Sequence, residues 1–308
     1  MTFTVLDTAT GMRETLTAPL RERSDRLRQM LTPMQEMYRY FPGEADVVAL
    51  HAMGQGFPLD RRTDEVLTAL DQLEAADAWT RIEAALQTGA DVHTEALPGL
   101  EVPDIAVLLV LGDPDDESFM GPARGATGNG SMTGYIQLTM WPTEENLARL
   151  EAAAVHELNH NLRYAPGGVV WDPARVVVGE HVVSEGLADA FARQLYGDEL
   201  GYTPIGRPHL DDDAVFDTVL TGLDVGGMEN FAAWVLGDEI AQRFGGAPVG
   251  VPTGGGYAVG NRLVDAYLAE TGATAAEALH VPSHEVRAAT PAAAVAHKSG
   301  TEQGTTSR

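Results

Sequence analysis

Apolar residues recur at intervals of three and four along residues 144–164, and this spacing predicts one amphipathic helix. Thr143 has the character of an N-cap, and the two glutamates after it complement the dipole of the first helical turn. Pro166-Gly167-Gly168 is expected to end the helix. The same spacing predicts packing helices within residues 13–40 and 63–86. The buried stripe of the 144–164 helix consists of Leu147, Leu150, Ala154, Leu158 and Leu162.

The character of the chain changes after about residue 100, where strands are expected. Residues 105–111 form a short, continuous apolar run that ends at Gly112-Asp113-Pro114, which indicates a buried strand. Residues 135–140 alternate in character and predict another strand. Between them, the Gly-, Ser- and Thr-rich residues 121–134 lack the lysine of a phosphate-binding loop, so we expect a wide hairpin turn. The predicted fold class is α+β.

This pattern divides the chain into three parts. We expect a mostly helical region at residues 1–100, a region with a small mixed sheet and further helices at 101–289, and a disordered tail at 290–308. In the second region a helix is expected to begin near Val178 and another at Tyr257. His51 and His93, in the first region, have no neighbour at ligand spacing and are expected to have ordinary surface or core roles.

Charge and composition narrow the possible partners and the cell compartment. The formal net charge is −25, so we expect neither nucleic acid nor an anionic membrane as a partner, since both would be repelled. Such a surface fits a high-salt cytosol or simply a soluble acidic protein. The chain has no cysteine, which leaves His, Asp and Glu as metal ligands. The first ten residues carry no signal-peptide pattern and no apolar run could span a bilayer, so we expect a cytoplasmic protein.

The clearest chemical pattern is His156-Glu157-Leu158-Asn159-His160, well inside the predicted 144–164 helix. Residues four apart lie on one face of a helix, so both imidazoles can bind a single ion, and two histidines so placed favour zinc. Glu157 is rotated by about 100° round the helix axis. We therefore expect Glu157 to face a metal-bound water rather than the metal, in the position of a general base.

Two imidazoles leave the ligand set incomplete, because a catalytic zinc usually has three protein ligands and a water. The predicted helix near Val178 carries Glu185 and Asp189 one turn apart on the same face. We expect Glu185 to bind the metal and Asp189 to accept the ring N–H of a ligating histidine. His181, one turn before Glu185, is the rival third ligand and is otherwise expected near the cleft. The alternative for both carboxylates is a solvated helical face.

Two further features suggest how a substrate could be bound. Tyr257 is a candidate for stabilising an oxyanion, because a phenol O–H is a suitable donor; a core aromatic at a helix start is the alternative. The 135–140 strand directly precedes the metal helix. If it lies at the sheet edge, unpaired backbone groups around Gln137 and Leu138 could hold a peptide in extended form. An internal strand without a substrate role is the alternative.

His156-Glu157-x-x-His160 followed by Glu185-x-x-x-Asp189 resembles the gluzincin metallopeptidases, the thermolysin-like class. A wider stretch is similar to a bacterial domain-of-unknown-function family of predicted Zn-dependent proteases. That resemblance covers about residues 7–287 and rests on Tyr135-x-Gln137-Leu138, on His156 to Arg163, on Val183 to Ala188 and on Gly256-Tyr257-x-x-Gly260.

The resemblance implies a zincin-like catalytic part, with zinc on His156, His160 and Glu185, Glu157 as the base and Asp189 orienting His156. The separation of 25 residues between His160 and Glu185 is longer than in thermolysin, which leaves the shape of the connection open.

These observations predict hydrolysis of a peptide or protein substrate by a metal-activated water, with Glu157 as general base. A zinc-binding pseudo-peptidase that acts as a protein-binding module is the alternative. The presence of Glu157 argues against it, because a structural zinc site usually closes all four positions with protein ligands. A metal-free helical protein with a chance motif is the third possibility. No pattern in the sequence indicates an oligomeric state.

Overall fold

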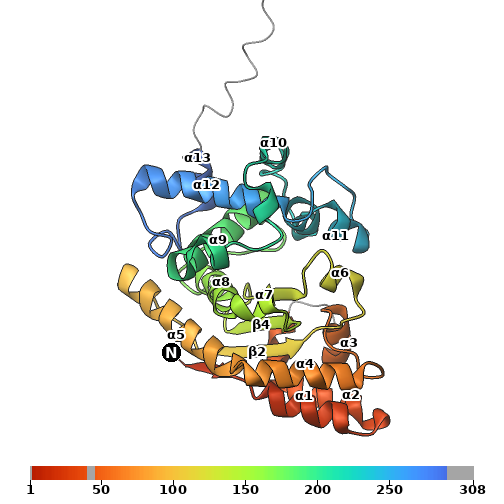
Figure 1. Ribbon diagram of the computed structural model, residues 1–308. Helices are drawn as coiled ribbons and strands as arrows, with labels where there is room; N and C mark the ends of the chain where they lie inside the picture. The colour runs from red at the N-terminus through yellow and green to blue at the C-terminus, as the bar shows by residue number, and fades with distance from the viewer. Residues whose placement is uncertain (1, 40–45, 290–308) are drawn as a thin grey trace, which may run out of the picture.

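The computed structural model describes residues 2–39 and 46–289. Its elements are arranged in layers (Figure 1): a small sheet lies in the middle, the N-terminal helices cover one side of it, and helices from the second half of the chain cover the other. The α+β class predicted from the sequence is confirmed. The tail predicted at residues 290–308 lies outside the described residues.

The first part of the chain is mostly helical, in agreement with its apolar spacing. The first helix begins after Asp7, whose side chain accepts a hydrogen bond from the backbone N–H of Thr10. Prolines mark later boundaries: Pro19 precedes the second helix, and Pro33 lies at the start of a 3-10 helix. The elements are α1 (Thr8–Thr17), α2 (Leu20–Leu31), η1 (Thr32–Tyr38), α3 (Val47–Met53), α4 (Thr63–Ala75) and α5 (Ala78–Ala96).

Four strands form one mixed sheet in the order β1-β2-β4-β3. β2 pairs in parallel with β1 and with β4, whereas β3 pairs antiparallel with β4. The sequence pattern does not predict β1, because three residues carry too little periodicity. Its pairing with β2 nevertheless brings the start of the chain into the sheet. The strands are β1 (Phe3–Val5), β2 (Ile105–Leu111), β3 (Ala126–Asn129) and β4 (Tyr135–Met140).

Of the two alternatives left open for the 135–140 strand, an edge strand and an internal strand, the structure has the internal one. β4 is paired along one side with β2 and along the other with β3. The Gly-rich segment forms the predicted hairpin with β4, and it supplies the edge strand itself, since residues 126–129 run along β4 before the turn. Among the described residues, β3 therefore ends the sheet on this side.

The predicted 144–164 helix is present in two parts, α7 (Glu144–Ala148) and α8 (Leu150–Arg163). The hydroxyl of Thr143 accepts the backbone N–H of Asn146, so the predicted N-cap is confirmed. The interruption falls at Arg149, whose guanidinium donates to the backbone oxygens of Glu199 and Tyr202. α8 packs against α5 and the sheet as well as against the next long helix, and most of its residues are buried. A short helix, α6 (Glu117–Met120), precedes β3.

The next long helix is α9 (Val178–Gly201), and it is central to the second half of the chain. Every residue from Val178 to Ala192 is buried, because α8 packs against it on one side and C-terminal helices on another. Gly197 has a φ of 77° and breaks the helical geometry. A helix buried on all sides shows little amphipathic pattern in sequence.

The C-terminal elements cover the far side of α9. Asp212 caps the first of the longer ones by accepting the backbone N–H groups of Ala214 and Val215. The elements are η2 (Arg207–His209), α10 (Asp213–Leu220), η3 (Met228–Asn230), the π-helix η4 (Ala232–Leu236), α11 (Asp238–Arg243), α12 (Gly255–Thr271) and α13 (Ser283–Ala288).

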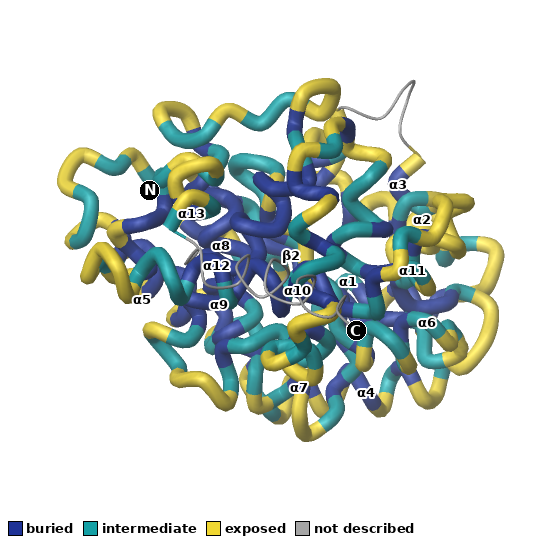
Figure 2. The backbone as a smooth tube through the Cα atoms, turned by 90° about the horizontal axis from the view of Figure 1, so that it is seen from above, coloured by how far each residue is buried: buried dark blue, intermediate teal, exposed yellow. Residues whose placement is uncertain are grey.

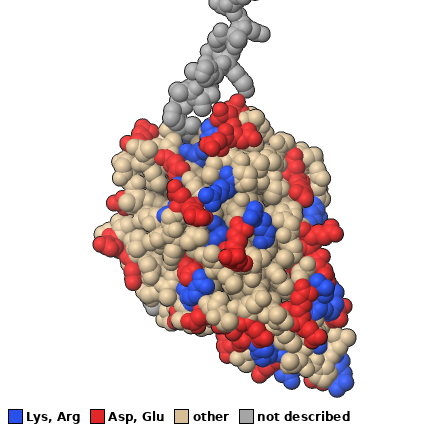
Figure 3. Space-filling model, in the orientation of Figure 1, with Lys and Arg blue, Asp and Glu red and all other residues tan. Residues whose placement is uncertain are grey.

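One hydrophobic core runs through both sides of the predicted boundary at residue 100. The hydroxyl of Thr8 donates to the backbone oxygen of Leu109, and α5 packs on α8. Figure 2 shows buried backbone through the middle of the molecule and exposed segments around its periphery. Figure 3 shows carboxylates spread over one face, with arginines among them. No helix in the described part of the chain is long and apolar enough to cross a membrane.

Candidate metal centre

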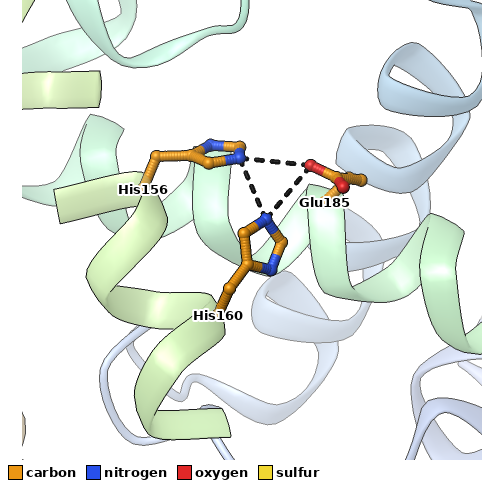
Figure 4. Close-up of side chains that lie close together, drawn as sticks. All are labelled: His156, His160 and Glu185. Carbon is orange, nitrogen blue, oxygen red and sulfur yellow. Dashed lines mark hydrogen bonds and ion pairs between the residues drawn. The ribbon is translucent and has the colours of Figure 1, made fainter. Parts of the chain in front are cut away.

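Three buried side chains from α8 and α9 converge on one point. Nε2 of His156 and Nε2 of His160 lie 3.1 Å apart, and Oε2 of Glu185 lies 3.1 Å from the first and 3.2 Å from the second. Figure 4 shows both imidazoles directed at this carboxylate. These are the residues that the sequence predicts as metal ligands. Within residues 2–39 and 46–289 they are the one group of three or more His, Asp or Glu side chains that could hold a metal ion.

The spacing of these atoms fits a tetrahedral zinc ion. Ligand atoms about 2.0–2.1 Å from a tetrahedral centre lie about 3.3 Å from one another, which is close to the observed 3.1–3.2 Å. Nδ1 of a neutral His156 donates to Asp189, so its Nε2 presents a lone pair to the other two groups. Lone pairs that face one point need a cation or a shared proton between them. Two imidazoles and a carboxylate are a donor set that suits zinc.

The groups shift one another's pKa values as opposite charges would. Burial lowers the pKa of His156, but hydrogen bonds with Asp189 and Glu185 outweigh burial and raise it well above its ordinary value. Burial raises the pKa of Glu185, but His160 and His156 outweigh burial and hold it well below the usual range of a carboxyl. The centre therefore stabilises a positive charge where the three groups meet.

Asp189 lies behind His156, in the position that the E-x-x-x-D spacing predicts. Its side chain is 1% exposed and receives four hydrogen bonds. Oδ1 accepts from Nδ1 of His156 at 3.0 Å and from the hydroxyl of Thr203 at 2.7 Å. Oδ2 accepts from the backbone N–H of Thr203 at 3.0 Å and from Nδ2 of Asn261 at 2.7 Å. With donors on both oxygens, the carboxylate is held in one orientation, and this fixes the tautomer and direction of His156.

His160 is held by a hydroxyl rather than by a carboxylate: its Nδ1 lies 2.9 Å from the hydroxyl oxygen of Ser184. The roles of Ser184, Thr203 and Asn261 are not predicted from the sequence. Ser184 could have been found, because it directly precedes Glu185 on the same helix. Thr203 follows the end of α9 and Asn261 lies in α12, so no spacing along one helix connects them to the motif.

Glu157 lies between α8 and the edge strand β3. The residue is 8% exposed, and a Cβ on Gly128 would collide with its Oε1, while a Cβ on Gly130 would collide with its backbone oxygen. Only glycine permits this approach. Burial raises the pKa of Glu157, and the two histidines and the backbone N–H of Gly130 act against that rise. A carboxyl group whose pKa is raised beside a metal centre is suited to proton transfer.

Asn161 fastens the turn that follows β3. Its Oδ1 accepts the backbone N–H of Gly134 at 3.0 Å. Its Nδ2 donates at 2.8–2.9 Å to the backbone oxygens of Gly130 and Met132 in the turn and of Tyr135 at the start of β4. The side chain is fully buried. One residue of α8 thus holds the glycine segment that lies against Glu157.

Tyr257 and His181 both lie near the centre, although neither belongs to the group of candidate ligands. The ring of Tyr257 lies 6.5 Å from that of His156, between centroids. Burial, with the carboxylates of Glu185, Glu157 and Asp189, raises the pKa of Tyr257 well above its ordinary value, so the phenol stays protonated. His181 packs edge-on against Phe231 at 5.0 Å, and burial lowers its pKa.

Gln137 and Leu138 do not lie at a free strand edge. Oε1 of Gln137 accepts a hydrogen bond from the hydroxyl of Tyr38 at 2.7 Å, which ties it to the N-terminal helices, and Leu138 is in the core. The backbone of β4 is engaged on both sides. Peptide binding by the backbone of this strand depended on a free edge, and that condition is not met, because β3 occupies the side of β4 that the peptide would need.

A buried ion pair joins the ends of α8 and α9 nearest the connection between them. Arg163 donates through Nε to Oε1 of Glu180 at 2.8 Å and through Nη2 to Oε2 at 3.1 Å. Its Nη1 donates to the backbone oxygens of Leu279 and Val281. A buried charge of this kind needs hydrogen-bond partners, and all three nitrogens of the guanidinium donate, to α9 and to the 279–281 segment. The pair thereby holds the two ligand-bearing helices together.

Comparison with known proteins agrees with the site. A family model described as "Predicted Zn-dependent protease (DUF2268)" matches residues 87–288, which include every residue of the metal centre. The uncharacterized protein YjfC of Bacillus subtilis (strain 168) is 31% identical over 179 residues, which are 58% of this chain and 58% of that relative. The chain thus covers less than two thirds of the length of this relative. No solved structure matches the chain.

Proposed function

We propose that this chain, which belongs to the family of predicted Zn-dependent proteases, is a zinc peptidase of the gluzincin type with Glu157 as its general base. The observation that carries the proposal is the triangle of His156 Nε2, His160 Nε2 and Glu185 Oε2, with sides of 3.1–3.2 Å. Three protein ligands leave the fourth position of a tetrahedral ion open, which is typical of catalytic zinc and not of structural zinc.

In this proposal His156, His160 and Glu185 hold the zinc. When bound, zinc supplies a Lewis acid that lowers the pKa of a coordinated water to about 7 and polarises a carbonyl group. Glu157 takes the proton of the attacking water and passes it to the leaving amine, and the burial that raises its pKa suits both transfers. Tyr257 donates its phenol proton in a hydrogen bond to the developing oxyanion.

We further propose that β3 holds the substrate. The backbone N–H of Trp141 donates to the backbone oxygen of Gly125, and this bond shows which residues of β3 turn their backbone groups toward β4. In an antiparallel pair alternate residues turn their backbone groups away from the partner, so those of Ala126 and Gly128 point away from β4. The N–H of Ala126 donates to the backbone oxygen of Ala123, so a peptide would pair with the oxygen of Ala126 and with the backbone groups of Gly128. A peptide that adds to this edge in extended form lies beside Glu157. The proposed substrate is therefore an unstructured peptide or segment of a protein.

The test compares zinc-loaded wild type with Glu157→Gln and Glu144→Gln on a library of unstructured peptides. Glu144 is an exposed glutamate of α7, so its substitution makes the same chemical change away from the site. We expect Glu157→Gln to retain zinc and to lose about 10²–10⁴-fold in hydrolysis, whereas Glu144→Gln matches the wild type. Stoichiometric zinc without hydrolysis of any peptide by the wild type would contradict the proposal and favour the pseudo-peptidase.

A further inference from the structure

α12 crosses α9 with the two backbones in contact. A Cβ on Gly186 would collide with the backbone of Gly260, and a Cβ on Gly260 would collide with the backbone of Val182. This close crossing brings the residue after Gly260, which is Asn261, beside Asp189 on the next turn of α9. The position of Asn261 therefore follows from a glycine contact that is outside the metal centre.

Asn261 acts in this network only as a donor. The residue is 1% exposed, and its Nδ2 donates to Oδ2 of Asp189 at 2.7 Å and to the backbone oxygen of Tyr257 at 2.9 Å. Both partners are acceptors, so the amide must turn its nitrogen toward them. Its Oδ1 has no hydrogen-bond partner in the described part of the chain. Both N–H groups are thus used, one on the carboxylate behind His156 and one on the segment that carries Tyr257.

We propose that Asn261 is a positioning residue of the metal centre. Without it, Oδ2 of Asp189 keeps only the backbone N–H of Thr203, and the carboxylate is freer to turn away from His156. The lone pair of His156 is then less well directed, and the affinity for zinc falls. The same amide holds the backbone of Tyr257 at a set place relative to Asp189. The inference rests on the zinc site proposed above, but it does not depend on hydrolysis.

The test measures zinc affinity by chelator competition for the wild type, Asn261→Ala and Asn146→Ala. Asn146 is a matched control, because it is also buried and its Nδ2 donates to three backbone oxygens, those of Arg124, Gly125 and Trp141. We expect zinc binding about 10–100-fold weaker in Asn261→Ala and unchanged in Asn146→Ala, even where both lower the thermal unfolding temperature of the metal-free protein. With Co²⁺ in place of zinc, only Asn261→Ala should change the visible absorption.

A second variant covers the case in which Asn261→Ala does not fold. Thr203→Val removes the hydroxyl donor to Asp189 and keeps the backbone N–H, so it should weaken zinc binding by a smaller factor. Wild-type zinc affinity in Asn261→Ala, or in Thr203→Val if the first variant is unfolded, overturns the positioning role. If zinc binding depends on Asn261 but the wild type cleaves no peptide, the proposed peptidase activity is contradicted and the positioning role of Asn261 is not. A wild type that binds no zinc overturns both proposals.

Discussion

The two sides of the centre are built differently. On the helical side, formed by α8, α9 and α12, buried polar side chains support one another: Asp189 receives four hydrogen bonds, and one of them comes from the candidate ligand His156. On the strand side, formed by β3 and the turn that Asn161 holds, the surface next to Glu157 is glycine backbone. The helical side is therefore suited to holding an ion, and the strand side is where the proposed substrate would lie beside Glu157.

This difference leads us to expect two separable effects. Substitutions on the helical side should weaken metal binding, and hydrolysis should fall as a consequence. Substitutions on the strand side should reduce hydrolysis while the metal stays bound, because no candidate ligand comes from β3.

The largest effect is expected on the helical side, from Glu185→Gln. A neutral amide replaces the carboxylate in the ligand triangle, and we expect zinc affinity to fall by more than about 100-fold, above the range for a residue that only supports a ligand. Chelator competition measures this loss. His181→Ala serves as the comparison, since His181 is the rival third ligand in the sequence, and it should retain zinc. If Glu185→Gln retains zinc and His181→Ala loses it, the ligand assignment is wrong.

A smaller loss, confined to hydrolysis, is expected on the strand side from Gly128→Ala. The added Cβ collides with Oε1 of Glu157 and displaces the carboxylate, and a misplacement of about 1 Å can cost about 100-fold in rate. Zinc affinity should stay unchanged, which separates this variant from Glu185→Gln. Gly226→Ala is the matched control, because the nearest atom to its added Cβ is 4.0 Å away. A loss of zinc in Gly128→Ala would mean that the two sides are not independent.

The smallest effect concerns a buried histidine without a carboxylate behind it. His93 stacks on Phe191 of α9 at 3.8 Å, and burial lowers its pKa to about 3, in contrast to the raised pKa of His156. Because histidine in the unfolded chain has a pKa of about 6.5, the unfolded state binds the proton first as the pH falls. The stability contributed by neutral His93 is complete above about pH 6.5 and is lost as the pH falls toward the folded pKa.

Between about pH 7 and about pH 5, the metal-free wild type should therefore lose about 2 kcal/mol of unfolding free energy through His93. His93→Phe keeps an aromatic ring against Phe191. Over the same pH interval its free energy of unfolding should fall by about 2 kcal/mol less than that of the wild type. Urea unfolding at both pH values measures the difference. Equal losses in the two proteins would show that His93 is not buried in its neutral form.

Prediction from the sequence was most successful where one helix carries the information. His156 and His160 share a face of α8, Glu185 and Asp189 share a face of α9, and the structure brings all four together. It was least successful for β3, because Gly128 and Asn129 are disfavoured in strands. That segment is extended because it pairs with β4 and because Asn161 holds its turn. For the same reason the sequence left open whether the strand of Gln137 is internal or at an edge.

Local sequence was thus enough to select the candidate ligands and to place Glu157 beside them, since hydrogen bonds between near neighbours in a helix set which side chains share a face. Tertiary structure alone decided which strand forms the free edge, and it alone brought Thr203 and Asn261 to Asp189. These positions depend on strand pairing and on the contact of Gly186 with Gly260, which join segments far apart in the chain. Neither contact leaves a periodic pattern in the residues that make it.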